Sequence, residues 1–519
     1  MTDLRSLLAE LDAAEDLLKI DERTHWADTA AAVAAEAARG NGPAVLLTDT
    51  GGTARPVSGT LGGPDRLSVR PRDPWSRIAA ALGLGIDADY LDVLDTLESA
   101  RRGGTAPPVA TLAATGRESD LRSLGIPAID GADLPVITLG LAAVPAENES
   151  EREIADRPPG ESDGAEHTDA AGDSDGQRVD VDAVNWLPVR GSIHGSDGLR
   201  LSVPATPAGE LSSGAPLSLV LGAPPTALIG ATMRWIGESH IDGAPRVANS
   251  LGDVPVAPTA AGGVPADSEI VVEATVTEPD ADTEPAGPKS PWEHAVTTAT
   301  MTAQVESVRI RPDPLLPFSP TGAAMSDGRS LLSIIESARL YGRVNNYWGV
   351  RPVEWLALPA EAGLGVCLVA SEILYAGFEW QLANTLFSFS RLFDKVVVLD
   401  TETAPMDLGR AFDDIWVKAH PANDWEFSDP EAPAATATHY RGDGSTGSNV
   451  YVNAAWDPRW DEEYIAPRVT FETTYPRNLR EAVRAEWEAL GFDHGPEYEA
   501  GHYHREASGE IDAENGAEE

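Results

Sequence analysis

Hydrophobic residues at the start of the chain are spaced as in an alternation of helices and short strands. Apolar positions recur every three or four residues over 4–11, with Asp3 in front as a capping residue, and this pattern predicts an amphipathic helix. The alanine-rich run 29–39 predicts a second helix, and the apolar run 44–47 predicts a buried strand. We therefore expect an N-terminal α/β domain over residues 1–145.

The middle of the chain changes to short β-rich runs separated by glycine and proline turns. This pattern is typical of a mostly antiparallel sheet or a split β-barrel, which we expect over residues 183–320. The runs are 199–203, 217–221, 269–276 and 300–310.

The third region, expected to span residues 321–475, returns to helices and strands in alternation. A helical face follows Ser330, and apolar residues at helical spacing from Leu374 to Phe393 predict a long amphipathic helix. Because strands alternate with helices, we expect a parallel sheet that is covered on its faces. The expected strands are 356–358, 366–369 and 396–399, with a further helix over 406–416.

Two segments lack the apolar residues that a core needs. Residues 146–182 are rich in Asp, Glu, Gly and Ser, which predicts a flexible acidic insertion. Residues 476–519 are expected to form one helix, over 479–490, followed by an acidic tail. The chain as a whole is thus predicted to be an α/β and α+β multidomain protein with a barrel-like centre.

The charge of the chain is extreme, with 83 acidic against 38 basic residues and a formal net charge of −45. Mutual repulsion at this charge destabilises a compact state and is screened by salt, so we expect a protein from a salt-adapted organism. Acidic tails on an ordinary domain are the alternative, although acidic residues are spread along the whole sequence. Nucleic-acid binding needs a basic surface and is not expected.

A single cysteine, Cys367, excludes an intrachain disulfide, and its apolar neighbours predict a buried, inert thiol. No apolar run approaches the ~18 residues of a membrane span, and the N-terminus lacks the pattern of a signal peptide. We therefore expect a cytoplasmic protein without a membrane span.

Three segments carry motifs that are more specific than the hydrophobic pattern. They read Asn-Trp-Leu-Pro-Val-Arg over 185–190, Leu-Ser-Leu-Val-Leu-Gly-Ala-Pro-Pro over 217–225, and Val-Pro-Ala-Asp-Ser-Glu-Ile-Val-Val-Glu over 264–273. In this order and at this separation they resemble the UbiD family of decarboxylases, which use prenylated FMN. That family includes 3-polyprenyl-4-hydroxybenzoate and ferulic acid decarboxylases, and the resemblance implies that the central domain binds the flavin.

The resemblance further implies a cofactor phosphate held through a divalent metal, Mn or Mg, and a monovalent cation such as K. Family metal ligands are an Asn, a His and a Glu; the matching residues here are Asn185 and Glu238, which would also contact the cofactor. Arg190, five residues after Asn185, matches a catalytic arginine at the cofactor. No histidine occupies 199–216, where the third ligand is expected, although a water or a main-chain carbonyl could take its place.

A second catalytic motif of the family, Glu-Gly-Pro-x-Gly-Glu, corresponds here to Ala-Gly-Pro-Lys-Ser-Pro-Trp-Glu over 286–293. Glu293 matches the second carboxyl, which donates a proton after carbon dioxide leaves and therefore needs a pKa raised by burial. The first carboxyl of the family motif is replaced here by Ala286 or displaced to Glu284. Without the resemblance, Glu293 is an exposed loop residue, Asn185 a turn residue and Arg190 a member of a surface ion pair.

Two functions follow from these motifs. The first is reversible, non-oxidative decarboxylation of a small aromatic or α,β-unsaturated carboxylic acid, with a flavin prenyltransferase supplying the cofactor. The second is a catalytically degenerate protein of the same fold that acts as a binding or assembly partner, because two polar positions of the family pattern are missing. The resemblance also implies a homodimer or a higher homo-oligomer.

Overall fold

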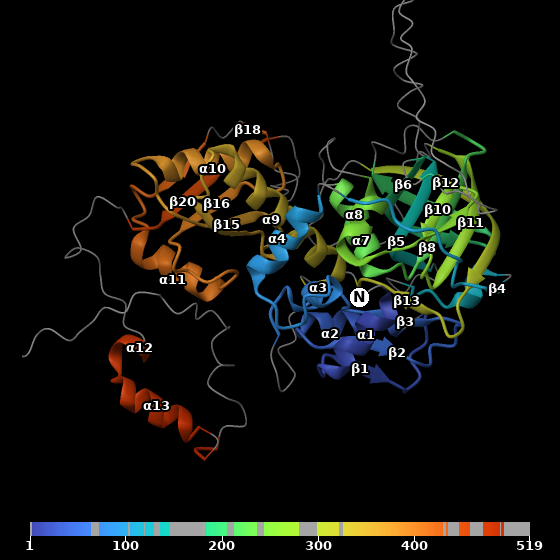
Figure 1. Ribbon diagram of the computed structural model, residues 1–519, viewed down its shortest axis with the longest axis horizontal. Helices are drawn as coiled ribbons and strands as arrows, with labels where there is room; N and C mark the ends of the chain where they lie inside the picture. Colours follow the sequence, from blue (N-terminus) through green and yellow to red (C-terminus); the bar gives the residue numbers. More distant parts are fainter. Residues whose placement is uncertain are drawn as a thin grey trace, which may run out of the picture.

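A computed structural model of the chain shows three domains, of which the middle one along the sequence is a β-barrel (Figure 1). It describes residues 3–27, 29–63, 72–101, 104–118, 120–128, 135–145, 180, 183–204, 212–235, 243–279, 298–320, 325–428, 432–433, 446–456, 471–487 and 489–491. The predicted acidic insertion, apart from Asp180, and the predicted tail beyond residue 491 lie outside these residues, as do Glu238 and Glu293.

The N-terminal domain is a small sheet covered by helices. Its first helix, α1 (Leu4–Ala13), buries all its leucines, and the Asp3 carboxylate caps it by accepting from Ser6 N at 2.9 Å. The helix expected over 4–11 is thus confirmed, and β2 (Ala44–Leu47) is buried as predicted. The other elements are β1 (Leu17–Ile20), α2 (Ala30–Arg39), β3 (Arg55–Ser58), α3 (Ser76–Ala81), α4 (Tyr90–Ala100) and the 3₁₀ turn η1 (Leu121–Leu124).

The central domain is a closed antiparallel barrel with the strand order β11-β8-β5-β6-β7-β12, in which β12 pairs back to β11. All the runs expected to be strands lie in it, so the predicted antiparallel, barrel-like centre is confirmed. A short edge strand, β4 (Gly116–Glu118), is added to β12. The barrel strands are β5 (Val136–Pro145), β6 (Val184–His194), β7 (Gly198–Pro204), β8 (Pro216–Leu221), β11 (Ile270–Glu278) and β12 (Thr298–Ile310).

Side chains of the barrel strands alternate between its interior and its outer surface. Leu187 and Val189 of β6 belong to the interior cluster, whereas Val184 and Trp186 pack on the outside under two helices. The Trp186 indole donates to Gly263 O at 3.0 Å, so the first half of β6 is fixed from both faces. The outer elements are the helices α7 (Pro225–Trp235) and α8 (Ala244–Gly252) and the hairpin of β9 (Val256–Thr259) and β10 (Gly262–Pro265).

The C-terminal domain contains a sheet with the order β14-β15-β16-β20-β17. Its three central strands are parallel, as predicted, but β14 and β17 are antiparallel edge strands. The link from β14 to β15 is too short for the crossover that parallel neighbours require. The elements are α9 (Asp327–Tyr347), β14 (Val353–Ala357), η3 (Ala360–Ala362), β15 (Val366–Ser371), α10 (Phe378–Phe389), β16 (Lys395–Leu399), α11 (Leu408–Lys418), β17 (Trp425–Phe427) and β20 (Val450–Ala454), with a small pair of β18 (Ala432–Pro433) and β19 (Thr446–Gly447).

The helix predicted from Leu374 to Phe393 is shorter at both ends. Gly377 adopts a left-handed φ of 87° and starts α10 at Phe378, which leaves Leu374 outside the helix and exposed. Phe393 follows the helix but is buried beside Phe387, at a ring separation of 6.0 Å. The apolar spacing therefore continued past both ends of the helix, to an exposed leucine before it and a buried phenylalanine after it.

Strand pairings cross two of the expected domain limits. β5 lies in the range 1–145 expected for the N-terminal domain, but it pairs with β6 and β8 of the barrel. β13 (Leu315–Pro317) lies in the range 183–320 expected for the barrel, but it pairs in parallel with β3 of the N-terminal sheet. An apolar run predicts a strand but not the sheet to which the strand belongs, because the strand with which it pairs is distant in the sequence.

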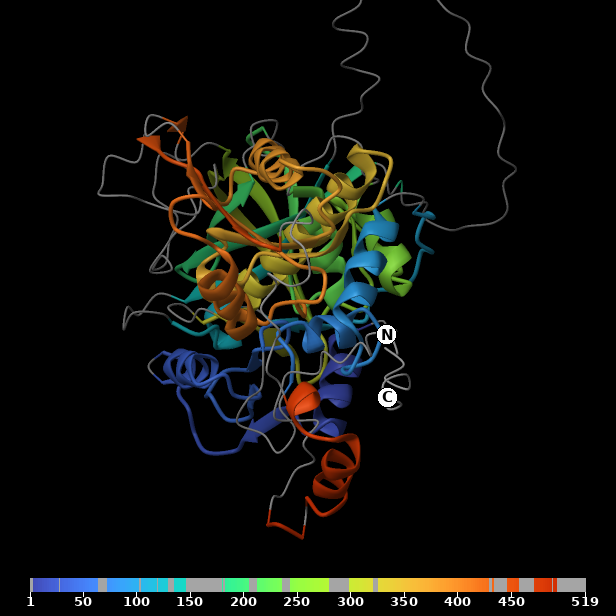
Figure 2. The ribbon, with the colours of Figure 1, turned by 90° about the vertical axis from the view of Figure 1, so that its left-hand side faces the viewer.

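The last described helices, α12 (Phe471–Thr474) and α13 (Arg477–Ala485), lie at the edge of the molecule, apart from the sheets of the three domains (Figures 1 and 2). The helix expected over 479–490 is therefore present but begins earlier and ends at Ala485. None of the residues of α13 is buried.

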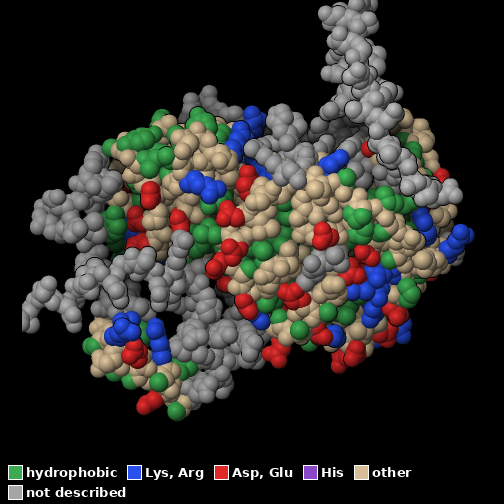
Figure 3. Space-filling model, in the orientation of Figure 1, with side chains coloured by type: hydrophobic (Ala, Val, Ile, Leu, Met, Phe, Trp, Pro, Cys, Tyr) green, Lys and Arg blue, Asp and Glu red, His purple; other side chains and the backbone are tan. Residues whose placement is uncertain are grey.

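Two predictions from composition can be compared with the surface and the core. Acidic side chains occur over all three domains on the face in Figure 3, in keeping with their spread along the sequence. Cys367 is buried, as predicted. Among the described residues, no helix combines the length and the hydropathy needed to cross a membrane.

Candidate functional site

Strand β6 carries the two predicted site residues that the structure describes, Asn185 and Arg190. Side chains of a strand alternate, so residues five positions apart point to opposite faces, with Cα atoms about 16 Å apart along the strand. Because Leu187 and Val189 face the barrel interior, Asn185 belongs to the interior side and Arg190 to the outer side. The structure therefore does not bring these two side chains together.

Asn185 lies at the rim of the barrel, opposite Val144 of β5, and is half-buried. Within the described part of the chain, no hydrogen bond uses its carboxamide group. Amide oxygens are among the ligands that hard divalent cations accept. Asn185 therefore fits the part of a metal ligand, but it supplies only one of the several oxygens that such a site needs.

Arg190 is exposed on the outer face of β6. On the β5 side the register shifts between Ile137 and Gly140, so that Thr138 and Leu139 both lie opposite Arg190. A bulge of this kind bends the strand and redirects side chains, and bulges are frequent next to active sites. Arg190 thus lies beside a local irregularity of the barrel, where a ligand can reach it.

Two helices, α7 and α8, pack on β6, and α7 also contacts α9 of the C-terminal domain. In the segment that leads to α9, Ser319 N donates to Thr138 Oγ1 in the β5 bulge at 2.8 Å. The Arg190 side of β6 therefore faces the junction between the barrel and the C-terminal domain, a frequent position for ligand sites.

The remaining predicted site residues, Glu238 and Glu293, lie outside the described residues, so their distance from Arg190 stays a prediction. Within the described ranges, no group of three or more His, Cys, Asp or Glu side chains is placed to hold a metal ion. His194, at the end of β6, shares a hydrogen bond with Ser192 Oγ through Nε2 at 2.8 Å. Burial, and then the charge of Arg200, lowers the pKa of His194, so its imidazole is neutral at pH 7.

Glu269, within the segment 264–273, has a structural role that sequence reasoning missed. Its fully buried carboxylate accepts from Arg5 at 2.7 and 2.8 Å, from Arg311 at 3.3 Å and from Leu315 N at 3.1 Å. These bonds join α1 and the start of β13 to the start of β11. The only sequence signal for this residue was its place in the motif over 264–273, which does not indicate what the side chain contacts.

Two further motif residues also serve the fold. Gly222 precedes α7, and a Cβ atom at this position would lie 2.7 Å from Glu269 Cβ, so only glycine fits. Glu273, at the end of the same motif, accepts from Ser218 Oγ at 2.8 Å and from Arg309 at 2.7 Å on the outer face of the barrel. The specific motifs of the central domain therefore include residues that position its strands.

A small hollow lies between α2 and β3, away from β6. It has an empty volume of about 260 Å³, part of it open to solvent, and its lining includes Ser58, Arg77 and Met325. The Arg77 guanidinium is already bonded to the Asp16 carboxylate at 2.6 and 2.7 Å and to Gly59 O at 2.9 Å. Because the Arg77 guanidinium is already bonded to groups of the core, we do not consider the hollow a candidate functional site.

Comparisons with known proteins give the family. The sequence matches three domain profiles of 3-octaprenyl-4-hydroxybenzoate carboxy-lyase: the N-terminal domain at residues 8–97, the Rift-related domain at 199–324 and the C-terminal domain at 329–454. A three-domain α/β protein with a Rift-related barrel is the class that this architecture defines. The chain belongs to the UbiD family of carboxy-lyases.

Solved structures resemble nearly the whole chain at low identity. Vanillic acid decarboxylase of Sedimentibacter hydroxybenzoicus, in its open form, is 17% identical with a TM-score of 0.71, and the match covers 94% of this chain and 99% of that chain. The UbiD-class enzyme HmfF from Pelotomaculum thermopropionicum, in complex with FMN, is 18% identical with a TM-score of 0.71, covering 91% and 99%. The apo form of 3,4-dihydroxybenzoic acid decarboxylase from Enterobacter cloacae is 14% identical with a TM-score of 0.68, covering 91% and 97%. At these identities the likeness shows the shared fold.

Proposed function

We propose that this protein removes carbon dioxide, reversibly and without oxidation, from a small aromatic or α,β-unsaturated carboxylic acid. The observation that carries the proposal is Arg190, a guanidinium exposed beside the β5 bulge on the outer face of the barrel. A guanidinium can bind a carboxylate through two parallel hydrogen bonds. Two structures of HmfF, one in complex with FMN and one with prFMN, support the choice of prenylated FMN as cofactor.

Prenylated FMN, when bound, would supply an electron-accepting group for the unsaturated bond of the substrate. Arg190 orients the carboxylate that leaves. Glu293 donates the proton that takes its place on carbon, which requires a neutral carboxyl group and hence a pKa raised by burial.

The anchor of the cofactor is assigned to oxygen ligands of this chain. Asn185 and Glu238 would hold a divalent metal, Mn or Mg, which with K would supply positive charge for the cofactor phosphate. Since Asn185 and Arg190 lie on opposite faces of β6, the metal and the substrate carboxylate are expected at separate points of the site.

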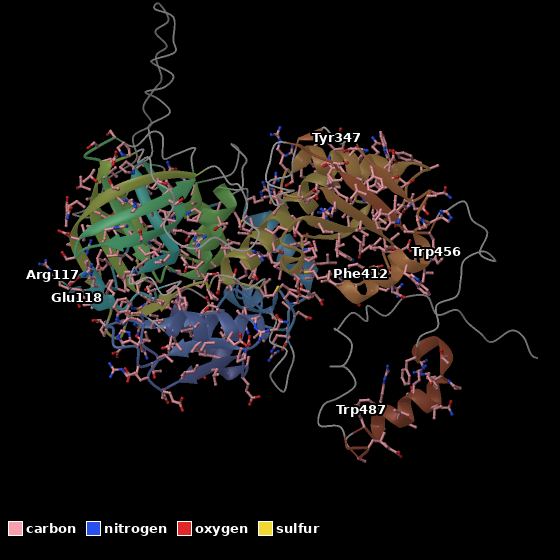
Figure 4. All side chains as sticks on the ribbon, turned by 180° about the vertical axis from the view of Figure 1, so that it is seen from behind. Arg117, Glu118, Tyr347, Phe412, Trp456 and Trp487 are labelled. Atoms are coloured by element: carbon pink, nitrogen blue, oxygen red, sulfur yellow. The ribbon has the colours of Figure 1, made fainter. Side chains whose placement is uncertain are left out.

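The proposal is tested by producing the full chain together with a flavin prenyltransferase. The purified protein should absorb as a flavin and release carbon dioxide from cinnamate-type acids. Glu293→Gln should keep the bound flavin and lose turnover. Arg117→Gln is the matched surface control, because Arg117 is exposed on β4 at the edge of the barrel (Figure 4), and it should behave as the wild type.

The second function left open by the sequence gives a different result in the same experiment. A protein that purifies without flavin, releases no carbon dioxide and still assembles would be a degenerate member of the fold that serves as a binding partner. Ala286, in place of the first carboxyl of the motif, is the observation that favours this alternative.

We also propose a homodimer or a higher homo-oligomer as the working form. Tyr475, Leu479 and Leu490, in and around α12 and α13, are 48%, 47% and 58% exposed, although residues of this kind are usually buried. Exposed apolar side chains gathered in one segment are typical of an interaction surface. An evolved form of HmfF is described as dimeric.

A further inference from the structure

The outer face of the barrel carries hydroxyl side chains on both sides of Arg190. On β7, Ser202 lies directly opposite Arg190 in the strand register. Leu201 and Val203, its neighbours along the strand, pack in the barrel interior, so Ser202 faces outward. Directly opposite residues of paired antiparallel strands have Cβ atoms about 4.5–5.5 Å apart. The Ser202 hydroxyl therefore lies beside the Arg190 side chain.

Thr138 occupies the corresponding place on β5, in the bulge opposite Arg190. The two residues that flank the bulge both face the barrel interior. Ile137 belongs to the interior cluster, and a Cβ atom on Gly140 would lie 2.9 Å from Val189 Cγ2. Thr138 therefore points outward, to the side of Arg190. Because neighbouring strands lie about 5 Å apart, Arg190 has a hydroxyl close by on each side.

The Thr138 hydroxyl is held in place through its oxygen. Thr138 is only 7% exposed, and its Oγ1 accepts from Ser319 N at 2.8 Å. Among the residues that the structure describes, this hydroxyl donates to no acceptor. A hydroxyl can donate one hydrogen bond while it accepts others, and buried donors are normally paired. The proton of Thr138 is therefore available to a bound acceptor on the Arg190 side of the strand.

Ser202 offers the same chemistry in a more accessible position. It is half-buried, and its hydroxyl makes no hydrogen bond within the described ranges. Together with the Arg190 guanidinium, the two hydroxyls bring hydrogen-bond donors from three strands to one part of the outer face. A guanidinium has no acceptor atom, so a ligand that fits here must carry the acceptors, as a carboxylate does.

We propose that the hydroxyls of Thr138 and Ser202 bind the leaving carboxylate of the substrate together with Arg190. The inference rests on the proposed function, in which Arg190 holds that carboxylate. The guanidinium and the two hydroxyls donate to its oxygens from β6, β5 and β7. Ser319 is a positioning residue, because the bond from its N–H occupies one lone pair of Thr138 Oγ1 and so orients the hydroxyl.

The test is calorimetric binding of benzoate and benzamide to the full chain purified from co-expression. Benzamide carries an NH₂ donor in place of one carboxylate oxygen, so the wild type should prefer benzoate. Thr138→Val keeps the side-chain shape without the hydroxyl and should weaken benzoate binding about tenfold, the usual effect of one hydrogen bond to a charged group. Benzamide binding should weaken less. Thr138→Ser, which keeps the hydroxyl, should bind benzoate as the wild type does.

Two further variants complete the series. Ser202→Ala should reduce the preference for benzoate by a smaller factor than Thr138→Val, because water can reach a half-buried site. Thr275→Val is the matched control, since Thr275 also faces outward from the barrel but lies on β11, three strands from β6. It should change neither affinity.

A Thr138→Val variant that binds benzoate as tightly as the wild type, or that weakens both probes equally, would overturn the inference. If Thr138→Val does not fold, as judged by circular dichroism, Ser202→Ala decides: an unchanged preference for benzoate rejects the proposal. Carbon dioxide release reports separately on the proposed function. A chain that releases carbon dioxide and loses the preference only in Arg190→Gln retains the proposed function and loses only this inference.

Discussion

Replacing Glu269 by glutamine removes the charge that joins α1, β11 and the start of β13. The carboxylate is fully buried and accepts from Arg5, Arg311 and Leu315 N. Glutamine has nearly the same volume but only one acceptor oxygen, and whichever way its amide group turns, the amide hydrogens would face a donor of Arg5. The substitution therefore breaks a charged contact without leaving a large cavity.

The size of the loss follows from the exposure of the partners. A hydrogen bond to a charged group contributes roughly 1.5–3 kcal/mol to stability. The side chains of Arg5 and Arg311 are 35% and 19% exposed, so both regain water once the carboxylate is gone, and the lower end of that range applies to each. We expect Glu269→Gln to lower the free energy of unfolding by about 3 kcal/mol, as for the loss of one partner of a buried ion pair.

The assay is urea unfolding, monitored by tryptophan fluorescence. The free energy of unfolding is measured for the wild type, Glu269→Gln, Arg5→Met and the double variant, which together form a double-mutant cycle. The two substitutions should be non-additive, because each removes the same contact. Glu36→Gln, which breaks the exposed pair with Arg39 on α2, should leave the transition unchanged. A Glu269→Gln variant as stable as the wild type, or an additive cycle, would refute the reasoning.

Three further outcomes are expected. Burial, and then the charge of Glu336, raises the pKa of the Cys367 thiol, so little thiolate forms at pH 8. A thiol reagent should therefore modify the unfolded chain and spare the folded one, and fast labelling of the folded chain would contradict this. With a net charge of −45, the urea midpoint should rise steeply between 0.1 and 2 M KCl, because the screening length falls from ~10 Å at 0.1 M to below ~3 Å; a flat response would count against salt adaptation. Leu479→Asp on α13 should dissociate the oligomer in light scattering, whereas Arg480→Asp should not, and equal masses for both variants would exclude α13 from the interface.

Local patterns predicted the elements whose formation depends on neighbouring residues. The leucine spacing of α1, the buried run of β2 and the apolar strand β16 all matched, since a helix face or a buried strand is visible within one segment. The pairing of β13 with β3 was not predictable in the same way, because it joins segments more than 250 residues apart. Closure of the barrel through β11 and β12 likewise depends on tertiary contacts.

The site shows the same division. Asn185 and Arg190 were identified through a motif, but their spacing on a strand already implies opposite faces, and this geometric consequence could have been predicted from the sequence. The contacts of Glu269 carry no comparable signal. Its partner Arg5 lies 264 positions away in the sequence, which no local pattern records.

The most direct test of Arg190 as the residue that holds the leaving carboxylate is carboxyl exchange with ¹³C-labelled bicarbonate. A reversible decarboxylase should transfer the label into the carboxyl group of an accepted acid, and this exchange should disappear in Arg190→Gln and persist in Arg117→Gln. Undiminished exchange in Arg190→Gln would contradict the assignment of the reaction to the outer face of β6.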